Sequence, residues 1–180
     1  MTKSLLLALS LVGLTGLMRG QDIPRPFVPD QIEAPANEDV IFVAHASGSQ
    51  IYTCELTGGT YGWKLKAPDA ELHDSQGAII GHHFAGPTWK HNDGSEVTGK
   101  AVAKVDPPQA DSIPWLLVTG VLARGSGHSG NGAFARVATI QRINTHGGQP
   151  PPGADCNAPK QNNETKSAYT ADYYFYAAAK

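Results

Sequence analysis

Short runs of β-branched and aromatic residues recur from Val40 onward, separated by clusters of Gly, Asn, Asp and Pro. Apolar and polar positions alternate within these runs. Tyr52, Cys54 and Leu56, for example, share one face of a strand. This pattern is typical of an antiparallel all-β domain. The strands that it predicts are Val40–His45, Gln50–Leu56, Tyr61–Lys66, Glu71–His73, Ala78–Phe84, Glu96–Val105, Trp115–Ala123, Ala133–Asn144 and Ala168–Ala177.

The connections between the runs contain residues that tolerate the backbone conformations of tight turns. Examples are Thr-Gly-Gly-Thr at 57–60, Asp-Ser-Gln-Gly at 74–77 and Asn-Asp-Gly at 92–94. Several adjacent strands should therefore pair as a meander. Short strands leave exposed edges unless the sheet closes or gains a second layer. We therefore expect a single antiparallel β-sandwich or a closed barrel of about eight to nine short strands.

The first twenty residues have the polarity of a secretory signal peptide, because Lys3 precedes an apolar run from Leu5 to Met18. The run has about 14 residues, fewer than the ~20 needed to cross a bilayer, so we expect no stable membrane anchor. We expect a secreted protein, located outside the cell or in the cell wall. Without Lys3 and Arg19, the exported chain would have 12 basic and 16 acidic residues, and so a net negative charge. With no basic cluster, nucleic acid is not an expected partner.

Two further segments differ from the strand pattern. Residues 21–39 contain four prolines, which predict an extended lead-in to the fold. Residues 40–180 are expected to form a single all-β domain, with a long proline-rich surface loop at 147–167. This loop contains Asn163 in an Asn-Glu-Thr sequence, an acceptor for N-glycosylation in an exported protein.

Cys54 and Cys156 are the two cysteines of the chain. In an oxidising compartment, an isolated pair forms a disulfide more often than it stays reduced. The alternatives are two buried thiols or a metal site, but no neighbouring Cys or His supplies the spacing of a zinc site. We predict a disulfide that ties the C-terminal segment to the middle of the fold.

Histidines are concentrated between His73 and His91, with Asp93 nearby. His82 and His83 should project to opposite faces of a strand, so at most one of them can join His91 in a common site. The sequence therefore offers His83 and His91 as a weak candidate metal pair. The structural alternative is that these imidazoles only satisfy half-buried polar positions, and we expect no cofactor.

The segment Gly125–Gly130 matches the glycine spacing of a dinucleotide-binding loop. That function needs a following helix and an acidic residue about 20 positions later. Here a predicted strand follows, so we interpret the segment as a flexible hairpin loop.

Aromatic residues are the remaining candidates for ligand contacts. Trp63, Trp89 and Trp115 lie on or beside predicted strands, and Tyr174 and Tyr176 share one face of the last strand. If that face is exposed, the rings could stack against sugars; the alternative is that they belong to the core.

Several short strings together resemble a family of secreted fungal and bacterial proteins known as domain of unknown function 3455. The resemblance covers most of the chain after about Ile32, and it implies export and a single domain without implying an activity or a cofactor. The strings are Gln50-Ile51-Tyr52, Ala67-Pro68-Asp69-Ala70, His83-Phe84-Ala85-Gly86-Pro87-Thr88-Trp89, Ile113-Pro114-Trp115-Leu116-Leu117, Ile140-Gln141-Arg142 and Tyr169-Thr170-Ala171-Asp172-Tyr173.

These observations favour a secreted, non-catalytic β-domain that binds a cell-surface or cell-wall polysaccharide or a partner protein. The alternative is a secreted enzyme, hydrolase-like or metal-dependent, that uses the region from His82 to Asp93. The absence of a complete catalytic motif from the sequence favours the first hypothesis.

Overall fold

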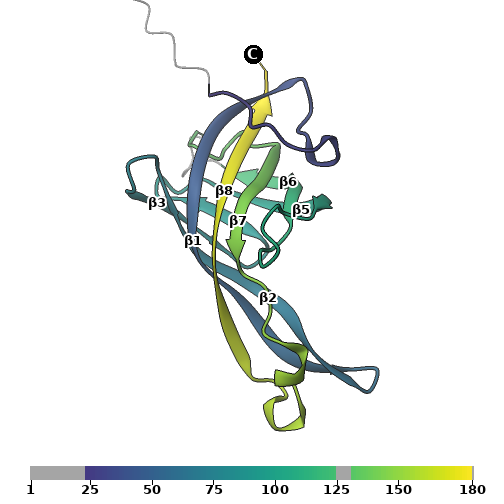
Figure 1. Ribbon diagram of the computed structural model, residues 1–180. Helices are drawn as coiled ribbons and strands as arrows, with labels where there is room; N and C mark the ends of the chain where they lie inside the picture. Colours follow the sequence, from purple (N-terminus) through teal and green to yellow (C-terminus); the bar gives the residue numbers. More distant parts are fainter. Residues whose placement is uncertain (1–22, 125–130, 180) are drawn as a thin grey trace, which may run out of the picture.

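The structure is a computed structural model that describes residues 23–124 and 131–179. The expected signal peptide at 1–20 and the glycine-rich segment 125–130 lie outside the described residues. Within the described part, eight antiparallel strands pair in sequence order, and β1 also pairs with β8 to close a barrel (Figure 1). The strands are β1 (Glu38–Thr57), β2 (Thr60–His73), β3 (Ile79–Phe84), β4 (Thr88–His91), β5 (Glu96–Val105), β6 (Trp115–Arg124), β7 (Thr139–Gly147) and β8 (Glu164–Ala178).

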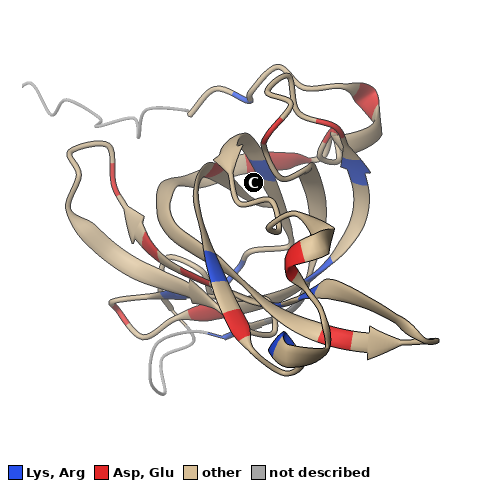
Figure 2. Cartoon of the chain, turned by 60° about the horizontal axis from the view of Figure 1, so that its bottom comes forward, with Lys and Arg blue, Asp and Glu red and all other residues tan. Residues whose placement is uncertain are grey.

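The prediction of an all-β fold is confirmed, and of the two expected architectures the chain adopts the closed barrel. Seen from below, the strands form a ring on which charged residues of both signs are scattered (Figure 2). Three short 3-10 helices complete the described elements: η1 (Asp30–Ile32), η2 (Gly153–Asp155) and η3 (Ala158–Lys160). No helix among the described residues has the length and hydropathy needed to span a membrane.

The first four predicted strands are in fact two continuous strands. β1 runs through residues 46–49, which lie between two of the predicted strands, and β2 likewise runs through Pro68. Gly48 is needed here for close packing, because a Cβ atom would lie 2.2 Å from the carbonyl oxygen of Asp69 in β2. A glycine in a strand often marks a close backbone approach rather than a turn.

The structure also adds one strand and corrects the start of another. Strand β4 was missed, because four residues are too few to show the alternation of a strand. The predicted strand Ala133–Asn144 begins only at Thr139. Before it, the backbone N–H groups of Ala133 and Phe134 donate to the side chains of Asp93 and Ser95, at 2.8 and 3.0 Å. These bonds replace pairing with a neighbouring strand.

The N-terminal segment, residues 23–37, covers one outer face of the barrel. Ile32 is fully buried, and its carbonyl accepts a hydrogen bond from the Gln141 side chain at 2.6 Å. Arg25 lies over the ring of Tyr176, with its guanidinium carbon 5.2 Å from the ring centroid. Both faces of β8 are therefore covered near its end, and Tyr176 is fully buried although it points away from the interior.

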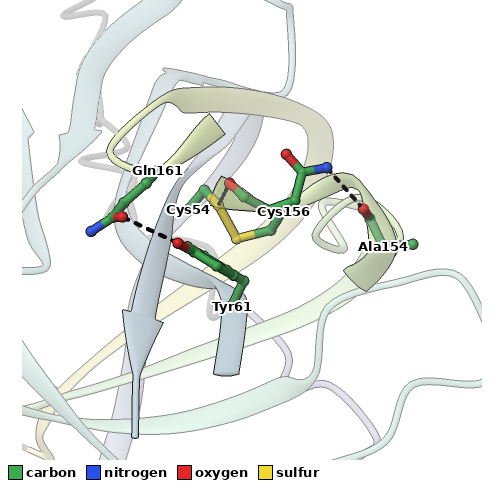
Figure 3. Close-up of a disulfide and its surroundings, with 6 residues drawn as sticks. Cys54, Tyr61, Ala154, Cys156 and Gln161 are labelled. Carbon is green, nitrogen blue, oxygen red and sulfur yellow. Dashed lines mark hydrogen bonds between the residues drawn. A yellow bond between two sulfur atoms is a disulfide. The ribbon is translucent and has the colours of Figure 1, made fainter. Parts of the chain in front are cut away.

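Three strands extend beyond the ring as an arm, which consists of the β1–β2 hairpin and the start of β8 (Figure 1). The predicted disulfide between Cys54 and Cys156 is present here and joins β1 to the loop before β8 (Figure 3). Backbone bonds from the Cys54 N–H to the Asn163 carbonyl and from the Asn162 N–H to the Cys54 carbonyl hold the same segments together, at 3.0 and 2.8 Å. Asn163 itself is exposed.

Replacement of both cysteines by serine should lower the free energy of unfolding. The bridge spans a separation of 102 residues, for which chain-entropy arguments and measured removals give a loss of roughly 2 to 5 kcal/mol. Equilibrium urea unfolding of the oxidised protein and of the double variant measures this difference. Equal stabilities would show that the hydrogen bonds of the arm suffice without the cross-link.

Candidate functional site

A pocket of about 700 Å³ occupies the barrel interior on the side of the arm. The pocket opens because β3 and β4 are shorter than β2 and β5, the strands on either side of them. The β3–β4 hairpin pairs with β2 only at 70–73 and with β5 only at 96–98. Residues 60–69 of β2 and 100–105 of β5 therefore have no strand partner on their facing edges within the described part of the chain. Exposed side chains that line the pocket come from both edges: Leu65, Lys66, Lys100 and Ala101.

The pocket walls combine apolar surface with a few polar groups. Trp89, Leu116 and Val118 supply much of the apolar lining. Gly99 makes room for the indole, because a Cβ atom at that position would lie 2.4 Å from Val118 and 3.2 Å from Trp89. A pocket of this size, mostly apolar with a few polar groups, is typical of small-molecule sites.

Gln50 is the most informative polar residue of the lining. It is 2% exposed, yet neither its amide nitrogen nor its amide oxygen has a hydrogen-bond partner among the described residues. Gln141 is equally buried, at 1%, but its amide donates to the Ile32 carbonyl and accepts from the Tyr176 hydroxyl. Buried amides are normally paired, since an unpaired one costs about 1 to 3 kcal/mol. The amide at the pocket is thus unpaired, whereas the equally buried Gln141 amide has two partners.

Two buried tyrosines on β8 extend the polar part of the interior. Tyr173 lines the pocket and Tyr169 lies near it. The two hydroxyls interact with each other, and the Tyr173 hydroxyl also interacts with Arg142 and Trp89. Burial raises the pKa of both phenols, while the charge of Arg142 acts in the opposite direction. Both are therefore neutral at ordinary pH and can donate or accept a hydrogen bond.

His83 forms one wall of the pocket, with its ring stacked on Trp89 at a centroid distance of 4.3 Å. Its Nδ1 donates to the Thr88 carbonyl at 2.9 Å, so in the neutral ring Nε2 is an acceptor. Burial lowers its pKa to about 3, and the nearby charge of Arg142 acts in the same direction. His83 is therefore an uncharged imidazole in the folded protein.

Arg142 brings a positive charge to the pocket from β7. Its Nε and Nη2 donate to the Pro114 carbonyl at 3.2 and 2.8 Å, which fixes the guanidinium. No Asp or Glu among the described residues forms an ion pair with it. Arg142 is half-buried, and a charge in such a position is normally paired.

The far end of the interior is filled by aromatic rings. Phe134 stacks on Phe175 with centroids 4.4 Å apart, and Phe42 meets Phe134 edge-on at 5.5 Å. His91 packs against the Phe42 and Phe134 rings. Asp93 anchors this cluster through its hydrogen bonds to Ser95 and Ala133. Burial works to raise the pKa of Asp93, but these bonds and the nearby His91 lower it well below its usual range.

His83 and His91, the predicted metal pair, each contact other residues of the fold. As the strand alternation required, His83 points inward and His82 outward. His83 contacts Thr88 and Trp89, whereas His91 lies in the aromatic cluster and accepts from the Asp93 N–H at 3.1 Å. Residues 23–124 and 131–179 contain no group of three or more His, Cys, Asp or Glu arranged to hold a metal ion.

The five predicted aromatic ligands do not form one exposed platform. Trp89 is buried in the pocket wall, and Trp63 is half-buried on the arm. Trp115, Tyr174 and Tyr176 pack under the N-terminal segment.

Sequence reasoning missed Gln50 and Arg142 as site residues. The available signal was strand alternation, which places Gln50 on the same inward face as Tyr52.

Fold and site together define a closed antiparallel barrel with an internal pocket. A family model, described as "Protein of unknown function (DUF3455)", matches residues 35–177. The chain belongs to this family, as the strings quoted from its sequence indicated. Comparison with curated proteins and with solved structures finds no match. The matched range contains every strand of the barrel from β1 to β7 and the pocket-lining part of β8.

The two buried glutamines should respond in opposite ways to substitution by methionine, which has a similar shape and no amide. Gln50→Met should leave stability unchanged or raise it by about 1 to 2 kcal/mol, because it removes unpaired polar atoms. Gln141→Met should lower it by about 1 to 3 kcal/mol, because it leaves the Ile32 carbonyl and the Tyr176 hydroxyl unpaired. Urea unfolding measures both, and equal losses would mean that the Gln50 amide is satisfied within the protein.

His83 should make folding sensitive to acid. Between pH 6.5 and about 3 the unfolded chain binds a proton at this residue and the folded protein does not. The contribution of the neutral His83 to the free energy of unfolding is therefore complete above pH 6.5. It is lost as the pH falls, by up to about 1.4 kcal/mol per pH unit. His83→Asn keeps a donor for the Thr88 carbonyl and should flatten this dependence. Urea unfolding at several pH values compares the slopes, and identical slopes would contradict the neutral, buried state.

Proposed function

We propose that this protein is a non-catalytic binding protein that holds a small molecule inside its barrel. An eight-stranded barrel has an interior just wide enough for side chains or for one small ligand. Here aromatic side chains fill one end, and a pocket of about 700 Å³ occupies the other.

The unpaired amide of Gln50 is the observation that carries this proposal. A ligand with one hydrogen-bond acceptor and one donor would satisfy it and gain orientation, while Trp89 and Val118 would take its apolar part. A protein under no demand to bind would gain stability from an apolar residue at this position.

Binding inside the barrel modifies the expectation of a polysaccharide partner. Burial of Trp89 and Tyr176 supports a ligand small enough to enter the pocket over a long chain laid across exposed rings. Export, residence in the cell wall, glycosylation of Asn163 and association with a cell-surface protein stay predictions. They are compatible with a carrier that acts outside the cell.

The alternative of an enzyme that uses the region from His82 to Asp93 receives less support. His83 is a buried neutral imidazole engaged with Thr88, and Asp93 serves a structural role between two loops. The described lining of the pocket contains no Ser, Cys, Asp or Glu beside His83.

Binding of the neutral fluorophore N-phenyl-1-naphthylamine tests the proposal. Ala101 lines the pocket and is exposed, so Ala101→Trp should narrow the opening without disturbing the core. The matched control is Val102→Trp, since Val102 is the next residue of β5, is 56% exposed and does not line the pocket. We expect Ala101→Trp to weaken binding by at least about tenfold and Val102→Trp to leave it unchanged. No binding by the wild type, or equal effects of the two substitutions, would refute a ligand site in the barrel.

A further inference from the structure

We infer that the ligand of the interior pocket is an organic anion with an apolar body, and that Arg142 binds its carboxylate. This inference rests on the proposed function and specifies its ligand. It follows from the charges around the pocket, which differ from those of the protein as a whole.

The described lining of the pocket contains three cationic side chains, Lys66, Lys100 and Arg142, and no Asp or Glu. The chain overall has a formal charge of −2. A pocket with one sign of charge and low-dielectric walls concentrates ligands of the opposite sign. The lining of the pocket is therefore positive in a protein that is negative overall.

Two carboxylates on adjoining strands, Asp69 and Glu164, already have partners. Asp69 of β2 bonds to Lys166 and to His82, both at 3.0 Å, and Glu164 of β8 bonds to Lys66 at 2.5 Å. Lys100 and Arg142, by contrast, have no carboxylate partner among the described residues. The unbalanced positive charge of the pocket thus rests mainly on these two side chains.

Arg142 is the residue placed to recognise a carboxylate. The Pro114 carbonyl holds its Nε and Nη2, so the orientation of the guanidinium is set before a ligand arrives. Its charge influences the pKa values of His83, Tyr169 and Tyr173, which shows that it lies close to the polar groups of the interior. A guanidinium has five N–H donors in a planar fork that matches a carboxylate. The Pro114 carbonyl takes one from Nε and one from Nη2, which leaves three N–H groups for a ligand.

The remaining groups suit the rest of such a molecule. The Gln50 amide can complete a hydrogen bond to the second carboxylate oxygen, since neither of its polar atoms has a described partner. Leu116, Val118 and the indole of Trp89 provide the surface for an apolar body. A neutral His83 adds no competing charge and offers an acceptor, so a ligand hydroxyl would find a partner there.

Displacement of bound N-phenyl-1-naphthylamine by three ligands of equal chain length tests the inference: octanoate, 1-octanol and octylammonium. The wild type should bind octanoate at least about tenfold more tightly than 1-octanol, and octylammonium most weakly, because charge-assisted hydrogen bonds exceed neutral ones. Comparable affinities of octanoate and 1-octanol, with the probe still displaced, would overturn the anion inference and leave the binding function intact. Failure of the wild type to bind the probe would instead refute the proposed function itself.

Substitution of the arginine tests its role directly. Arg142→Met should remove the preference for octanoate over 1-octanol while leaving the affinity for 1-octanol within about twofold, and Arg142→Lys should retain part of the preference. The control is Arg136→Met, since Arg136 is exposed and does not line the pocket, and it should behave as the wild type. A preference for octanoate that survives Arg142→Met would assign the recognition to another group. If Arg142→Met does not fold, the comparison of ligands in the wild type and in Arg142→Lys still decides the question.

Discussion

Pairing between the first and the last strand is the interaction on which the molecule depends. β1 follows β8 from Glu38–Ala178 to Thr53–Glu164, and this ladder converts an open meander into a barrel. Without it, both strands would present unpaired edges, and the inner faces of β1 and β8 would lose the opposite wall. Closure buries Gln50 and Tyr173 and turns the inner face of a sheet into a pocket.

The same ladder explains why the interior has two different ends. At one end Phe42 and Phe175 occur as direct partners of β1 and β8, and Phe134 packs onto them from the loop that Asp93 holds. At the other end the two strands continue past the ring into the arm. There the short β3–β4 hairpin pairs with only the last residues of β2, so the rest of that edge of β2 has no described strand partner. Differences in strand length thus decide where the barrel is filled and where it is open.

Much of the fold could be predicted from the sequence, because it follows from patterns among residues that are close in the chain. Alternation separated His82 from His83, and two isolated cysteines in a chain with the pattern of an exported protein indicated a disulfide. The errors arose where a residue serves a partner far away in the sequence. Gly48 lies between two of the predicted strands, but its role is set by Asp69 of the neighbouring strand, and residues 133–138 are held by Asp93 and Ser95 about forty positions earlier. The site was harder to predict, because it also depends on residues that are distant in the sequence. That Gln50 lacks a hydrogen-bond partner and Arg142 lacks a carboxylate can be seen only in the closed barrel.

The aromatic filling formed by Phe42, Phe134 and Phe175 has a kinetic consequence. Because these rings fill one end of the barrel, a ligand bound as proposed would enter and leave through the other end. Association and dissociation of such a ligand would then use the same opening, between the facing edges of β2 and β5, so a substitution that narrows this opening would slow both.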